Sequence, residues 1–367
     1  MRFGTIPCGV RIAYLVHFRG GSDTGIFRKV ASQAAAWARS GWDVGLFVTT
    51  DEASAPEWTA LPQAATVIAA STGPRSLFAT RDRLANALLR WRPDVVYARH
   101  TLVYPGIVRI ARQRPVVLEV NSDDVSEFKA VSTRRYRFAR ATRGLLLSRA
   151  AGLVFVTHEL ERNPRFARYR RPSIVIANGI PLDDVAELPA PSNSAPRLIF
   201  LGHPHSPWHG LDQLEDMAAA FPDWRFDVVG PDRGELKRDL ANVTAHGVLR
   251  PEAFRPLLAA ADVAIGTLGL YRKNMNEASA IKLREYLASG LPAIIGYLDT
   301  DFPDPPPFLL QIPNRDGGVS DSVGAIAHFV RAWMGRRVPR EAIRGIDSAA
   351  KESARLGFFE RFVASRT

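Results

Sequence analysis

The chain has almost no cysteine: its 367 residues include a single one, Cys8. One thiol excludes an internal disulfide framework and any metal site built from cysteines. Long apolar runs are missing as well. The best candidate, residues 145–156, is interrupted by Ser148 and Arg149, whereas a membrane-spanning helix needs about 20 mostly apolar residues. The N-terminus shows no signal-peptide pattern, so we expect a cytoplasmic protein.

Acidic residues are absent from one long segment, between Glu127 and Glu159. Six arginines lie in this segment, in a chain whose formal net charge is already +11: Arg134, Arg135, Arg137, Arg140, Arg143 and Arg149. Such a positive field attracts phosphates, anionic lipid head groups or nucleic acid, and an arginine-rich solvated surface explains it equally well. One interpretation is an amphipathic helix at Arg134–Arg149 that holds the protein peripherally on the inner face of an anionic membrane. No nucleic-acid partner is expected, because the arginines lack interleaved base-stacking motifs.

Short apolar runs alternate with longer amphipathic stretches along both halves of the chain. Residues 11–18 and 42–49 predict strands, and residues 25–40 between them predict a helix with apolar side chains at helical spacing. The pattern restarts with a strand at 198–201 and a helix at 211–221. This alternation predicts an α/β fold in which helices cover both faces of parallel sheets, and the length favours two domains.

Proline marks the boundary between the two predicted domains. Residues 181–196 contain four prolines and two serines and predict a linker. We expect a first Rossmann-like domain at 1–180, a second at 197–345, and a C-terminal helix within 346–367 that packs back on the first domain. Open parallel sheets bind ligands at the carboxyl ends of their strands, so the loops that follow the strands are the candidate sites.

The densest polar chemistry lies at the start of one predicted helix of the second domain. Ser279 can cap this helix by accepting an amide hydrogen bond. The free amides of Ala280, Ile281 and Lys282, together with the Lys282 ammonium, then attract an anion. One turn on, Glu285 shares a face with Lys282, and its carboxylate can accept two hydrogen bonds from a ribose diol. The segment predicts a site for a diphosphate with its ribose; the alternative is an amphipathic surface helix with an incidental Lys–Glu pair.

This segment resembles the donor-binding helix of retaining GT-B glycosyltransferases, in particular family 4. Glu277 and Glu285 have the spacing of that family's Glu-x7-Glu motif, and Lys282 to Pro292 is similar to the Lys-Leu-x-Glu-Tyr-x-Ala-x-Gly-x-Pro of one subgroup. The resemblance implies two Rossmann-like domains that face each other across a cleft. It implies retaining transfer of a sugar from a nucleotide diphosphate sugar to a glycan or lipid-linked acceptor, without a metal or other cofactor. By the same resemblance, Glu285 binds the donor ribose, Lys282 the diphosphate, and Glu277 is a candidate for contact with the sugar.

A glycine-rich segment of the second domain adds to the resemblance. Its Pro207–Asp212 part is similar to a Pro-Trp-His-Gly-Val-Asp variant of the family's strand-to-helix turn. The resemblance implies that Gly202 lets the backbone approach the donor, and that His203 and His209 stand where the family often has basic residues. Neutral histidine binds phosphate less strongly than lysine, so Lys282 remains the main cation. The histidine spacing fits a metal poorly, and no metal site is expected.

Two further glycine turns are candidates for contact with the donor. Gly247 and Val248 follow a predicted strand, and the resemblance implies that their backbone lies against the nucleobase; a plain strand-to-helix turn fits equally well. Gly25 begins the first predicted helix, and the resemblance implies an approach to the donor phosphates. Its loop, residues 20–25, is not Gly-x-Gly-x-x-Gly, so dinucleotide binding is weakly supported.

Candidates near the reacting sugar lie at strand ends of the first domain. Asn121 occupies the place where the family often has a histidine, and its amide can hydrogen-bond a sugar hydroxyl but cannot act as a base. His100 also follows a strand and is expected to face the cleft, with a surface-loop histidine as the alternative. Asp299 and Asp301 are similar to the Asp-x-Asp of metal-dependent glycosyltransferases, but their place before a proline-rich loop predicts turn chemistry.

Two other functional classes remain open. A sugar-nucleotide epimerase of the GT-B fold would need acid–base residues around the sugar and no acceptor. A catalytically silent GT-B binding protein is the other, suggested by the departures at His203, His209 and Asn121.

Overall fold

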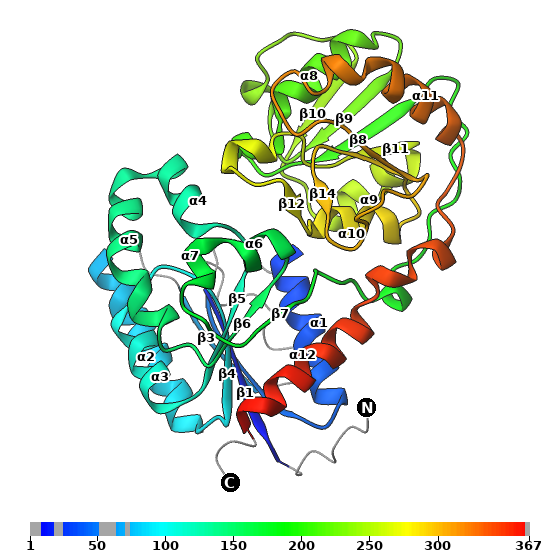
Figure 1. Ribbon diagram of the computed structural model, residues 1–367. Coiled ribbons are helices and arrows are strands. Elements are labelled where there is room, and N and C mark those ends of the chain that lie inside the picture. Colours follow the sequence, from blue (N-terminus) through cyan, green and yellow to red (C-terminus); the bar gives the residue numbers. More distant parts are fainter. Residues whose placement is uncertain (1–8, 18–24, 51–63, 70–73, 364–367) are drawn as a thin grey trace. The chain divides into compact units, whose positions relative to one another are not determined.

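The computed structural model describes residues 9–17, 25–50, 64–69 and 74–363 (Figure 1). The chain divides into two compact units, one formed by residues 1–177 with 349–367 and the other by residues 178–348. The chain therefore passes between the units twice, and the proline-rich segment 181–196 lies within the second unit.

A seven-stranded parallel sheet forms the centre of the first unit, in the order β3-β2-β1-β4-β5-β6-β7. Its strands are β1 (Arg11–His17), β2 (Asp43–Thr50), β3 (Ala64–Ala69), β4 (Val95–Arg99), β5 (Val116–Val120), β6 (Gly152–Phe155) and β7 (Ser173–Val175). The central strands are buried because helices cover both faces, as is usual for parallel sheets (Figure 1). The strand order reverses between β1 and β4, and open α/β sheets bind ligands at such a reversal.

Eight helices of the described residues belong to this unit: α1 (Gly25–Arg39), α2 (Pro74–Trp91), α3 (Pro105–Gln113), α4 (Asp124–Val131), α5 (Thr133–Leu147), α6 (His158–Arg162), α7 (Pro164–Ala167) and, apart from its first residue, α12 (Ser348–Val363). The last of these returns to pack beside α1. Glu352 accepts hydrogen bonds from Trp37 Nε1 at 2.8 Å and Gln33 Nε2 at 3.1 Å and pairs with Arg355. Phe359 packs edge-on against Trp37, with the ring centroids 5.6 Å apart.

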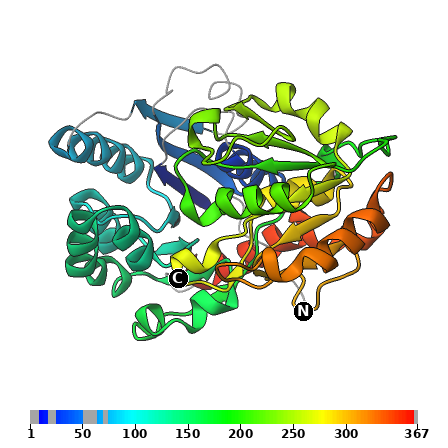
Figure 2. The same cartoon turned by 90° about the horizontal axis from the view of Figure 1, so that it is seen from above.

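The second unit is built on a six-stranded parallel sheet in the order β10-β9-β8-β11-β13-β15. Its strands are β8 (Arg197–Leu201), β9 (Arg225–Val229), β10 (Val243–Gly247), β11 (Val263–Ile265), β13 (Ala293–Ile295) and β15 (Leu309–Gln311), and β12 (Glu277–Ala278) pairs separately with β14 (Leu298–Asp299). The helices are α8 (Leu211–Ala220), α9 (Pro251–Ala260), α10 (Ile281–Ala288) and α11 (Val323–Trp333). Figure 2 shows the same helices and strands from above. Among the described residues, no helix has the length and apolarity to cross a membrane.

A buried arginine joins three segments of the second unit. Arg284 on α10 is fully buried and donates two hydrogen bonds to the Asp299 carboxylate, at 2.8 and 2.9 Å. It also donates to Asp301 at 2.6 Å, to the Asn178 carbonyl at 2.9 Å and to Ser279 Oγ at 3.0 Å. The backbone amide of Asn178 donates to the same Ser279 oxygen at 2.8 Å. We call these five residues the Arg284 clamp. It ties the point where the chain enters this unit to the start of α10.

The prediction of an α/β fold with parallel sheets is confirmed. The strand predicted at 42–49 is β2, and the helices predicted at 25–40 and 211–221 are α1 and α8. The arginine-rich segment contains the helix α5. The strands β12, β14 and β15 were not predicted, because two or three residues are too few to show a period.

Replacing Arg284 by methionine is expected to lower the free energy of unfolding by about 3–5 kcal/mol, because it leaves the buried Asp299 carboxylate without its partner. Urea unfolding followed by tryptophan fluorescence measures the loss. The matched control is Arg315→Met, which removes an exposed ion pair with Asp321 in the same unit and should cost less than about 1 kcal/mol. Equal losses in the two variants would show that the clamp does not stabilise the unit.

Candidate functional site

The start of α10 presents backbone amides without a side-chain cap. The helix begins at Ile281, its N-cap is Ala280, and no side chain accepts a hydrogen bond from its first turn. The prediction that Ser279 caps this helix is wrong, because its hydroxyl lies in the Arg284 clamp and accepts hydrogen bonds there. In the part of the chain that the structure describes, no acceptor meets the amides of Ile281 and Lys282. These two donors are therefore available to an anion.

The Lys282 side chain starts in the first turn of α10, and its ammonium lies against the end of β8. Its Nζ donates a hydrogen bond to the Leu201 carbonyl at 3.0 Å and lies 4.8 Å from the centroid of the Phe200 ring. No carboxylate forms an ion pair with it among the described residues. Burial lowers the pKa of Lys282 to about 7, because the ammonium loses hydration and, in the described part of the chain, no negative charge nearby compensates for that loss. An arriving anion would restore that stabilisation.

His209 adds a neutral donor to the same place. Burial, reinforced by the nearby positive charges of Lys282, His203 and Lys273, lowers the pKa of His209 to about 2. Its Nδ1 accepts a hydrogen bond from the backbone amide of His203 at 2.9 Å. Since Nδ1 is the acceptor, the single proton of the neutral ring is on Nε2, which can donate to a ligand.

Two glycines let the backbone of this loop take its path. Gly210 has φ +78°, and a Cβ there would lie 2.8 Å from the Leu268 Cβ. A Cβ on Gly202 would lie 2.6 Å from a ring carbon of Phe200. Both positions exclude a side chain on steric grounds, so the loop that carries His203 and His209 takes this path only with glycine at its two ends.

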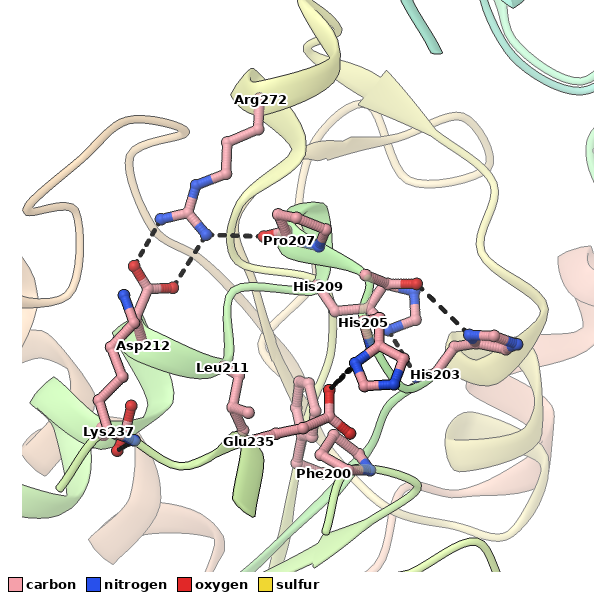
Figure 3. Close-up of a pocket in the computed structure, with 13 residues that line it drawn as sticks. Phe200, His203, His205, Pro207, His209, Leu211, Asp212, Glu235, Lys237 and Arg272 are labelled. Atoms are coloured by element: carbon pink, nitrogen blue, oxygen red, sulfur yellow. Dashed lines mark hydrogen bonds and ion pairs between the residues drawn. The ribbon is translucent and has the colours of Figure 1, made fainter. Parts of the chain in front are cut away.

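A cavity of about 560 Å³ opens beside this loop (Figure 3). His203 and His209 line it, but Lys282, Glu285 and Val248 do not. On its far side, Arg272 donates two hydrogen bonds to the Asp212 carboxylate, at 2.9 and 2.6 Å, and one to the Pro207 carbonyl at 2.6 Å (Figure 3). The charge of Arg272 is therefore compensated by Asp212.

The turn after β10 presents an apolar side chain to solvent. Gly247 has φ +67°, and Val248 is 77% exposed. Hydrogen bonds from the Gly230 amide to the Gly247 carbonyl at 2.7 Å, and from the Gly247 amide to the Pro231 carbonyl at 3.2 Å, join this turn to the loop after β9. An exposed apolar side chain on a fixed turn suits contact with a flat ring.

The two predicted glutamates differ in their surroundings. Glu285 is half-buried on α10, one turn after Lys282. Glu277 is buried, 7% exposed, on the short strand β12 that precedes the helix. The structure thus brings Ala280, Ile281, Lys282 and Glu285 together on one helical end.

The remaining predicted residues lie in the first unit. Gly25 begins α1, and residues 20–24 of its loop lie outside the described residues. His100 and Asn121 directly follow the neighbouring strands β4 and β5. Burial lowers the pKa of His100, and its Nε2 has no hydrogen-bond partner among the described residues. This unpaired nitrogen is buried, so a ligand reaches it only if neighbouring side chains move.

Sequence reasoning missed two buried ion pairs that position these candidates. The Arg284 clamp was missed because the family motif leaves that position unspecified; the neighbouring Asp299 and Asp301, which need a counter-charge, were the available signal. In the first unit, Lys29 on α1 pairs with the fully buried Glu119, which lies two residues before Asn121. Burial alone would raise the pKa of Glu119, but the positive charges of Lys29, Arg99 and Arg355 lower it to about 2.

Comparisons with known proteins agree with this architecture. Residues 24–179 match the family described as glycosyl transferase 4-like domain. No curated protein matches the chain. A sucrose-phosphate synthase from Thermosynechococcus elongatus is 15% identical, with a TM-score of 0.71 over 97% of this chain and 100% of that one.

Two other solved structures are similar over the whole chain. HepE from Anabaena, solved in complex with UDP and glucose, is 15% identical, with a TM-score of 0.64 over 96% of this chain and 100% of that one. The lipopolysaccharide outer core galactosyltransferase WaaB is 13% identical, with a TM-score of 0.64 over 98% of this chain and 100% of that one. At these identities the likeness shows the fold. The chain therefore has the GT-B fold, and its residues 24–179, less than half of its length, are similar to the glycosyl transferase 4-like domain.

Proposed function

We propose that the protein transfers a hexosyl group from a nucleotide diphosphate sugar to an acceptor hydroxyl, with retention of configuration. The observation that carries this proposal is the cluster of hydrogen-bond donors at the start of α10. The free amides of Ile281 and Lys282, the Lys282 ammonium and the neutral His209 ring supply donors of the kind that bind a diphosphate.

The parts of a nucleotide on either side of its diphosphate also have candidate partners. Glu285, one turn further along α10, is proposed to accept hydrogen bonds from the ribose hydroxyls. The exposed Val248 on the turn after β10 is proposed to contact the base. HepE was solved with UDP and glucose, which makes a uridine nucleotide the first donor to test.

Electrostatic stabilisation of the leaving group would be the main source of catalysis. The bond between the anomeric carbon and the phosphate oxygen breaks, and the carbon bonds to the acceptor oxygen on the same face. The acceptor proton passes to the departing phosphate oxygen, so no separate base is required. Lys282, His209 and the helix amides would stabilise the charge that develops on the diphosphate, and activity is expected to persist in the presence of a chelator.

His100 and Asn121 are proposed to position the acceptor and the reacting sugar from the first unit. The amide of Asn121 cannot act as a base, and burial lowers the pKa of His100, which makes its neutral ring a weaker base than an exposed histidine. Glu277 is proposed to contact the transferred sugar, although its burial on β12 leaves a small part of it accessible.

The variants Lys282→Met and Glu285→Gln test the donor site. Each is expected to weaken the binding of the nucleotide sugar by about 10- to 100-fold. Lys282→Met removes the ammonium that faces the diphosphate, and Glu285→Gln replaces a charged acceptor of the ribose hydroxyls by a neutral amide with one acceptor fewer. The donor is first identified by a thermal-shift screen of UDP-, GDP-, ADP- and TDP-sugars, and titration calorimetry then gives the dissociation constants. The matched controls are Arg331→Met and Glu341→Gln, which change exposed residues in the same way and should leave the dissociation constant unchanged.

Several outcomes of these experiments would contradict the proposal. Unchanged affinity in Lys282→Met and Glu285→Gln would remove the donor site from α10. Epimerisation of the free donor without acceptor would identify an epimerase. Donor binding without turnover on a panel of glycan and lipid-linked acceptors would identify a binding protein.

Donor affinity is expected to depend on pH through Lys282. Its ammonium is charged below a pKa of about 7 and neutral above it, whereas the diphosphate of an intact nucleotide sugar keeps its charge. The dissociation constant should therefore rise above pH 7, by up to about tenfold per pH unit, and level off below it. Lys282→Met should give a flat profile in the same titrations; a slope that persists in this variant would assign the titration to another group.

A further inference from the structure

The helix α5 exposes large apolar side chains on the first unit. Phe138 is 40% exposed and Leu145 is 48% exposed, and no other apolar side chain of comparable size is as exposed within the described part of this unit. The two positions are seven residues apart, which is close to two helical turns, so they lie on the same face. A soluble domain gains nothing from holding two such side chains in water.

The opposite face of α5 is anchored in the unit, which fixes the direction in which Phe138 and Leu145 point. Arg143 is buried and donates two hydrogen bonds to the Asp124 carboxylate, at 3.0 and 2.8 Å. Its guanidinium also lies 4.7 Å from the centroid of the Phe166 ring. Leu146 and Leu147 are buried on the same side. Ser132 caps the helix by accepting a hydrogen bond from the Arg135 amide, where α5 follows α4 (Figure 1).

The segment that carries the apolar pair also holds exposed arginines, and it contains no acidic residue between Glu127 and Glu159. The arginines with exposed side chains in this segment are Arg134, Arg135, Arg137, Arg140 and Arg149. At 3.6 residues per turn, Arg134 and Arg137 lie on the side of α5 that carries Phe138 and Leu145. We call these four residues the α5 face. A polyanion such as nucleic acid would use the arginines but would gain little from Leu145. The surface of a lipid bilayer can bind both kinds of side chain, because its phosphates attract arginine and its acyl chains accommodate apolar groups.

We propose that the α5 face binds the surface of an anionic lipid bilayer. Phe138 and Leu145 enter the boundary between head groups and acyl chains, and the arginines bind lipid phosphates while their methylene stems lie along the interface. This proposal does not depend on the proposed sugar transfer, because the α5 face is complete within the first unit. Substitutions in the α5 face should leave nucleotide binding unchanged, and this measurement distinguishes failure of one proposal from failure of the other.

Co-sedimentation with vesicles tests the proposal on the full chain. The protein should sediment with vesicles of phosphatidylcholine mixed with phosphatidylglycerol and stay in solution with phosphatidylcholine alone. The double variant Phe138→Ser/Leu145→Ser should lower the partition coefficient at least about tenfold. Arg134→Ala/Arg137→Ala should lower it to a similar extent, and added salt should weaken binding of the wild type.

Control substitutions distinguish vesicle binding through the α5 face from a general attraction due to the protein's net positive charge. Arg331→Ala/Arg336→Ala removes two exposed arginines from the second unit and should leave vesicle binding unchanged. Phe138→Trp should keep binding and add a blue-shifted fluorescence component on vesicles, because tryptophan prefers the membrane interface. A melting temperature equal to that of the wild type shows that each variant is folded.

Three results would overturn the proposal. One is the absence of sedimentation with anionic vesicles. Another is binding that is lost with the arginines but unaffected by Phe138→Ser/Leu145→Ser, which would describe a site for a polyanion. The third is release of the protein from vesicles by a short DNA duplex that binds more tightly than the lipid.

Discussion

The pairing of one buried guanidinium determines the geometry of the candidate donor site. Arg284 has no exposed surface, and a charge removed from water in this way is tolerated only when its donors are paired. The Arg284 clamp satisfies this condition by drawing Asn178 and Ser279 to the start of α10 and Asp299 to its side. The helix end is therefore positioned before any ligand binds, which is the condition for effective electrostatic stabilisation of a leaving group.

The side chains that would bind the anion carry little positive charge at neutral pH: Lys282, with a pKa of about 7, is about half protonated, and His209 is neutral. Burial lowers the pKa of both Lys282 and His209, so the empty site avoids the cost of holding several positive charges close together. A diphosphate reverses this balance at Lys282, because it supplies the counter-charge that the protein lacks there. His209 contributes a donor without a charge. The departure from the basic residues usual in the family is thus compatible with anion binding, through hydrogen bonding and induced protonation.

The sequence predicts helices with a periodic apolar pattern and motifs made of consecutive residues. It predicts far fewer of the side-chain contacts between residues that are distant in the sequence. The helices α1 and α8 were predictable because their apolar residues recur at helical spacing, and the α10 motif because it is contiguous. Ser279 was assigned to the wrong partner because capping rules consider only the next few residues, whereas its hydroxyl is bound by Asn178, 101 positions away. The counter-charge of Asp299 and Asp301 was missed for the same reason: Arg284 contacts them through the tertiary fold.

The arginines of the acid-free segment differ in burial, and they therefore have different roles. Arg140 and Arg143 are three positions apart in the same acid-free segment, yet the first is exposed and the second is buried against Asp124. Helical spacing decides between them, because Arg143 lies one turn after the buried Ala139 and beside Leu146 and Leu147. The buried arginine fixes how α5 is rotated, and that rotation exposes Phe138 and Leu145. The membrane-binding face proposed for this helix therefore depends on an arginine that is itself buried and makes no contact with the lipid.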